Sequence, residues 1–113
     1  MIPEDIIDKV LDAVDSDELI SLTKDLVKIN SVWDPAAGTS EQVAAEDAAR
    51  WAARRGFDVQ QEEVVSGRPN VIVTWRFGPG KRTLMFEGHT DVVTPGDIST
   101  WRHDPFAAEI VER

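Results

Sequence analysis

The stretch that decides the fold class is residues 83–93, which read Thr-Leu-Met-Phe-Glu-Gly-His-Thr-Asp-Val-Val. Residues 83–86 show no polar–apolar alternation, which is typical of a strand covered on both faces. This strand runs into Gly88, and in extended backbone residues i and i+2 point the same way. We therefore expect His89 and Asp91 to project together from the carboxyl end of a buried strand, where open α/β sheets place their ligands.

Two helices are expected at the start of the chain. Apolar residues spaced by three and four positions from Ile6 to Val14 predict the first of them. Asp15 should cap the second helix while Glu18 reaches back to the cap, as in a capping box. The apolar stripe of this helix predicts an end near Asn30.

A third helix should follow a loop at residues 31–40. Thr39 or Ser40 is the expected cap, and Gly56 should end the helix because glycine tolerates the left-handed conformation found there. The side chains expected to face inward are Ala44, Ala48, Trp51 and Ala52.

Strands are expected from about residue 57 onward, where the apolar period changes from a helical one to alternation. Residues 57–65 and 71–77 predict two strands joined by a turn, and residues 107–111 predict a short last strand. Together with the buried strand at residues 83–86, helices followed by strands indicate an α/β layered domain.

Composition limits the classes of function. The 113 residues are 42% apolar and 29% charged, as in an ordinary soluble globular protein. A net charge of −9 argues against nucleic acid or anionic membrane as a partner. The acidic N-terminus does not look like a secretory signal and no apolar run is long enough to span a membrane, so we expect a cytoplasmic protein.

Metal chemistry must use histidine and carboxylates, because the chain has no cysteine. Such ligands suit zinc, manganese or cobalt. A neutral His89 is a good zinc ligand, and Asp91 on its other ring nitrogen would fix the tautomer. One histidine and one aspartate do not close a zinc site, however. The spacing alone therefore favours a loop histidine that is hydrogen-bonded to a nearby aspartate.

The wider segment changes this interpretation. The run Gly88-His-Thr-Asp-Val-Val93 is followed by Trp101-Arg-His-Asp-Pro-Phe106. This two-part motif resembles the zinc-dependent metallopeptidase family of aminoacylases, acetylornithine deacetylase, succinyl-diaminopimelate desuccinylase, carboxypeptidase G2 and carnosine-type dipeptidases. Residues 26–32, 55–59 and 68–71 match the same family in the same order, so the resemblance covers the chain from about Asp17. Asn30 departs from the proline of many members, which affects only a loop.

The resemblance implies a fold, an activity and roles for two residues. Residues 1–113 would be the N-terminal portion of a three-layer α/β/α catalytic domain with a mixed sheet, incomplete as given. The whole protein would cleave amide bonds in dipeptides or N-acyl amino acids with two zinc ions, which cobalt or manganese could replace. His89 matches a metal ligand, and the catalytic Asp91 matches the carboxylate that orients this imidazole.

The same resemblance implies that much of the active site lies outside this sequence. The bridging aspartate, the Glu-Glu pair with the general base, a further acidic ligand, a distal histidine and the lid domain, through which the complete protein could form a homodimer, have no match here. We therefore expect a fragment that is inactive alone. Two alternatives stay open: a truncated, non-catalytic binding or assembly module, and a marginally folded chain that associates through uncovered strand edges.

Two further residues near the motif have simpler interpretations. His103 does not match a ligand of the family and is expected to be a surface loop residue. Glu87 adjoins the motif but matches no family role, so a structural interpretation is preferred. The four tryptophans are not spaced like a stacking platform for nucleic acid.

Overall fold

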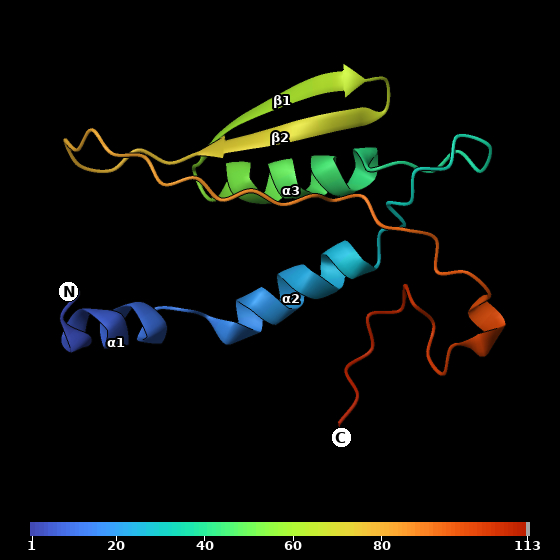
Figure 1. Cartoon of the computed structure of the whole chain (residues 1–113), viewed down its shortest axis with the longest axis horizontal. Helices are drawn as coiled ribbons and strands as arrows, with labels where there is room; N and C mark the ends of the chain where they lie inside the picture. The colour runs from blue at the N-terminus through green and yellow to red at the C-terminus, as the bar shows by residue number, and fades with distance from the viewer. Residues whose placement is uncertain (113) are drawn as a thin grey trace.

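The computed structural model describes residues 1–112 and contains three helices followed by a hairpin. The elements in chain order are α1 (Glu4–Asp12), α2 (Ser16–Val27), α3 (Gln42–Arg54), β1 (Asp58–Val65), β2 (Arg68–Thr74) and the short 3₁₀ helix η1 (Ile98–Thr100). Helix α3 lies against one face of the hairpin, whereas α1 and α2 lie apart from it (Figure 1). The predicted order of helices and then strands is confirmed up to the end of β2.

Within residues 1–112, only one of the two hydrogen bonds of the capping box predicted for α2 is present. The Asp15 carboxylate accepts a hydrogen bond of 3.0 Å from the Glu18 backbone N–H, which confirms the predicted cap. The Glu18 carboxylate does not return this bond in the described structure, because it forms an ion pair with Arg55 instead. Neither α1 nor α2 has a buried residue.

Helix α3 provides the core of the described chain. Its buried side chains are Ala44, Ala45, Ala49 and Ala52. Ala48 and Trp51, which were expected to face inward, are half-buried. Gly56 follows the helix with a φ of 80°, as predicted for a glycine in the left-handed conformation. Because alanines are small, α3 packs closely on the hairpin.

The hairpin is antiparallel, with a register from Asp58 opposite Thr74 to Val65 opposite Arg68. Its first strand agrees with the prediction, but the second begins three residues early and ends before Trp75. Phe57 nevertheless lies between the aromatic rings of Trp51 and Trp75, with centroid distances of 6.5 and 5.2 Å. These contacts join the end of α3 to the open end of the hairpin, where β1 begins and β2 ends.

Two predicted strands are wrong. Residues 83–86 and 107–111 have no regular secondary structure, and Leu84 and Phe86 are 78% and 87% exposed. A strand covered on both faces needs neighbouring strands to pair its backbone and further layers to cover its side chains. Within residues 1–112 the sheet has only β1 and β2, so the described structure is a small α/β arrangement without a mixed sheet.

The surface area shows how much apolar side chain remains uncovered. The chain exposes 9853 Å², whereas a folded protein of 12.6 kDa exposes about 6,200 Å². Its radius of gyration is 17.5 Å, against about 13 Å for a compact domain of this length. Packing is therefore concentrated in α3 and the hairpin. Among the described residues, no helix has both the length and the apolar character needed to cross a bilayer.

Candidate active site around His89

The loop that carries His89 is tied to the exit of α2. After β2 the chain turns back and reaches the segment that follows α2 (Figure 1). There Val32 and Val92 form an isolated parallel bridge, and the Val92 N–H donates to the Ser31 carbonyl at 3.4 Å. Ser31 itself is buried. This bridge fixes the backbone three residues beyond His89, although no strand precedes it.

His89 and Asp91 lie together, as the sequence predicted. The Nδ1 atom of His89 is 2.9 Å from the Asp91 carbonyl oxygen and 3.0 Å from the Asp91 Oδ1 atom. Both oxygens can only accept, so Nδ1 carries the proton of the neutral ring and donates it. The Nε2 atom is then left with a free lone pair on a side chain that is 84% exposed. The contact arises within irregular backbone rather than from the alternation of a strand.

The second oxygen of Asp91 faces Arg68, a residue to which the sequence motif assigned no role. Asp91 Oδ2 is 3.8 Å from Nη2 of Arg68, at the start of β2. Arg68 donates through Nε to Glu41 Oε1 at 2.7 Å, and its Nη2 contacts the same oxygen. The hydrogen bond to Glu41 raises the pKa of Arg68. No spacing rule relates Glu41, Arg68 and Asp91, because only the fold brings them together.

An apolar groove opens beside His89. Its volume is about 540 Å³, and its wall is formed by the end of α2, the segment after His89 and the loop after η1. The apolar side chains that line it include Leu26, Ile29, Val92, Val93, Trp101 and Phe106. An apolar groove with one imidazole at its wall can receive the apolar part of a small molecule next to a polar reacting group.

The loop that contains η1 is held by its own hydrogen bonds. The Trp101 indole N–H donates to the Pro95 carbonyl at 3.0 Å. The Asp97 carboxylate accepts from the Ser99 backbone N–H at 2.9 Å, and hydrogen bonding from Ser99 lowers the pKa of Asp97. His103 lies farther along this loop, where its Nδ1 is 2.7 Å from Glu109 Oε2. Its place on an exposed loop agrees with the prediction.

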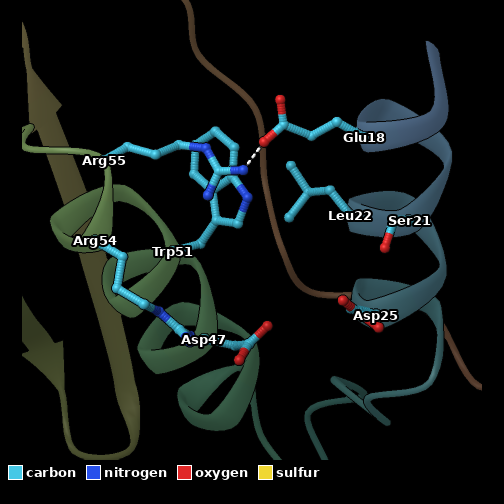
Figure 2. A pocket seen from close by; sticks show the side chains of 8 residues that line it. All are labelled: Glu18, Ser21, Leu22, Asp25, Asp47, Trp51, Arg54 and Arg55. Carbon is cyan, nitrogen blue, oxygen red and sulfur yellow. Dashed lines mark ion pairs between the residues drawn. The ribbon is translucent and has the colours of Figure 1, made fainter. Parts of the chain in front are cut away.

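A second hollow separates α2 from α3 (Figure 2). Its volume is about 330 Å³, and Glu18 on one wall forms an ion pair with Arg55 on the other. The Arg55 guanidinium also lies over the Trp51 ring, 4.0 Å from its centroid. The side chains of this hollow connect two helices, and it contains neither histidine of the chain.

The described residues fit one metal ligand, not a complete metal site. His89 offers a bare Nε2, whereas both Asp91 oxygens face other side chains. Within residues 1–112 no group of three or more histidines and carboxylates is placed to hold an ion. Zinc sites in proteins use three or four protein ligands. Any such site here would need ligands from outside the described residues.

The chain is similar in sequence to curated proteins named succinyl-diaminopimelate desuccinylase. One from Cereibacter sphaeroides is 36% identical over 93 residues, which cover 82% of this chain and 23% of that protein. One from Rhodopseudomonas palustris is 35% identical over 99 residues, or 84% of this chain and 24% of that protein. The protein numbered 1 in Ruegeria sp. is 40% identical over 96 residues, again 82% of this chain and 23% of that protein.

The chain therefore spans only 23–24% of the length of these curated relatives. No protein-family model matches it. No solved structure matches it either. The expected resemblance to the family that includes succinyl-diaminopimelate desuccinylase is confirmed, for a portion of that family's length.

Proposed function

We propose that this chain forms the first part of the catalytic domain of a metal-dependent hydrolase that cleaves the amide bond of an acylated amino acid. The observation that carries the proposal is the His89 imidazole, whose Nδ1 is held by two oxygens of Asp91 while Nε2 faces solvent. The similarity to desuccinylases favours an N-acyl amino acid, with a dipeptide as the other candidate substrate.

In this proposal His89 is a metal ligand through Nε2, and Asp91 fixes the ring so that Nε2 stays unprotonated. The metal would be zinc, in a pair of ions, with cobalt or manganese as substitutes. A bound zinc ion supplies Lewis-acid polarisation of the amide carbonyl and lowers the pKa of water. The apolar groove beside His89 would hold the apolar part of the substrate against this centre.

The exposed apolar segment at residues 84–86 supports a proposal for the rest of the domain. Leu84, Met85 and Phe86 would form a strand once neighbouring strands pair with it and helices cover both faces, which would give the three-layer α/β/α domain with a mixed sheet. Residues 1–113 would then be inactive alone, because one histidine does not hold a catalytic metal.

The test uses the protein as its source expresses it, with an N-succinyl amino acid as substrate and metal content measured on the same sample. We expect His89→Ala to abolish hydrolysis and to remove at least one metal ion per chain. Asp91→Asn should lower the rate about 10- to 100-fold, as for other partners of metal-bound histidines. His103→Ala is the matched control and should leave both quantities unchanged. Normal rate and metal content in His89→Ala would refute the proposal.

A second candidate function belongs to another class, a non-catalytic binding or assembly module. The exposed surface of 9853 Å² favours it, because uncovered apolar surface promotes association. Native mass spectrometry of the natural protein separates the two candidates. A chain much heavier than 12.6 kDa with two metal ions supports the hydrolase. A chain of that mass without metal supports the module.

A further inference from the structure

The Arg68 guanidinium is held more tightly than its partial exposure suggests. Its Nε and Nη2 atoms both contact one oxygen of Glu41, a carboxylate whose side chain is only 9% exposed. The other Glu41 oxygen is buried and has no hydrogen-bond partner within residues 1–112. A buried carboxylate is tolerated only when it is paired. Glu41 therefore depends on Arg68, and this dependence fixes where the guanidinium lies.

A second contact fixes the plane of the same guanidinium. Its central carbon lies 4.8 Å from the centroid of the Trp33 ring, within the range of a cation–π interaction. Trp33 follows α2, Glu41 precedes α3 and Arg68 begins β2. Residues from two other segments of the chain thus orient Arg68. Its guanidinium has five N–H donors, so it can contact a further group as well.

The Nη2 atom of Arg68, which contacts Glu41, is also the atom that faces Asp91. The two oxygens of the Asp91 carboxylate face different residues. Oδ1 lies 3.0 Å from His89 Nδ1, and Oδ2 lies 3.8 Å from Arg68 Nη2. A continuous series of charged and polar groups therefore leads from buried Glu41 through Arg68 and Asp91 to the exposed His89 ring. Asp91 is about half exposed, and without Arg68 only the imidazole would restrain its rotation.

We infer that Arg68 is a positioning residue for His89, which it orients through Asp91. Arg68 restricts the Asp91 carboxylate to the rotamer that accepts from Nδ1, and this keeps Nε2 without a proton. Lysine would not replace it fully, because the planar fork both grips Glu41 and stacks on Trp33. The inference rests on the proposed role of His89 as a metal ligand, and it assigns functions to Arg68 and Glu41 that the sequence motif does not contain.

The test measures the tautomer of His89 directly, on the full chain without metal or substrate. Nitrogen-15 NMR of histidine-labelled protein gives the ratio of Nδ1–H to Nε2–H forms at a pH above about 7.5, where an ordinary imidazole is neutral. His103→Gln assigns the signals, since the chain has two histidines. We expect wild type to favour Nδ1–H, and Arg68→Gln to lower the ratio about two- to fivefold, the range for an exposed ion pair.

A control and a double variant separate positioning from general stability. Arg76→Gln, at an exposed arginine without an ion pair in the described residues, should leave the ratio unchanged. Asp91→Ala should lower the ratio, and adding Arg68→Gln to it should have no further effect, because Arg68 acts through Asp91. An equal fall in the Asp91→Ala background would overturn the inference.

An unchanged ratio in Arg68→Gln, with the amide signals of β1 and β2 intact, would also overturn it. If that variant loses the hairpin signals, Arg68→Lys decides the matter: a partial fall supports the inference and a wild-type ratio refutes it. The outcome is independent of catalysis. The ratio can respond as expected in a protein that hydrolyses nothing, in which case the proposed function fails and the positioning role stands.

Discussion

Residues 42–74 and residues 75–112 differ in whether their apolar side chains find partners within the chain. In the first region α3 places four buried alanines against β1 and β2, its neighbours in sequence. In the second region Leu84, Met85 and Phe86 stay exposed, and regular structure is limited to the three residues of η1. The first region is a packed support, whereas the second carries His89 and Asp91. The loop therefore depends on the support through Arg68, and it is also tied to the exit of α2 through the bridge to Val32.

The largest effect should come from placing a charge in the support. Ala45→Asp buries a carboxylate without a partner at a position that is 1% exposed, and we expect a loss of about 3 kcal/mol or more in the free energy of unfolding. Leu84→Asp introduces the same carboxylate at an exposed position of the other region, and it should shift the free energy of unfolding by less than about 0.5 kcal/mol. Urea denaturation followed by circular dichroism measures both. Equal losses of unfolding free energy in the two variants would show that residues 83–86 are packed in solution. The two regions would then not differ in packing.

A smaller effect is expected where the support meets the loop. Glu41→Gln removes the charge that holds Arg68 and should lower the free energy of unfolding by about 1.5–3 kcal/mol, the range for a hydrogen bond to a charged group. The matched control is Glu46→Gln, whose partner Arg50 lies 4.0 Å away on the surface of α3. This control should change the free energy by less than about 0.5 kcal/mol. If both variants behave alike, Glu41 is not the anchor that its burial indicates.

The sequence predicted the start of α2 and the support well because the signals there are local. The Asp15 cap, the glycine after α3 and the strand signal of β1 each depend on a few adjacent residues, and each agrees with the structure. The prediction of a strand at residues 83–86 was wrong. Its apolar pattern indicates burial between neighbouring strands and helices, which residues 1–112 do not supply. The spacing of His89 and Asp91 predicted that they lie together, and the family resemblance suggested their roles. Arg68 lies in a matching segment but received no role, because its link to Glu41 spans 27 positions.

A still smaller effect concerns α2, which has no buried residue and reaches the support through one ion pair. Glu18→Gln should reduce the free energy of unfolding by at most about 1 kcal/mol, since both partners are roughly 40% exposed. The difference from wild type should shrink in 1 M salt, where the screening length falls to about 3 Å. Asp25→Asn, on the same hollow, is the control. A difference that does not depend on salt would mean that packing around Trp51, rather than charge, joins α2 to α3.

The smallest effect tests whether the second region has any fixed local structure. The pKa of Asp97 is lowered by hydrogen bonds from Ser99, so its folded value lies below that of the unfolded chain. The ionised carboxylate therefore stabilises η1 above the ordinary aspartate pKa of about 3.9, and this contribution disappears as the pH falls through the lower folded value. NMR should show the Ser99 amide shift changing with a midpoint below the ordinary aspartate value of about 3.9. Asp97→Asn should abolish the transition while leaving β1 and β2 unchanged. A midpoint at the ordinary value would mean that the loop beside the groove is not held in solution, and the second region would then differ from the support even more than the structure shows.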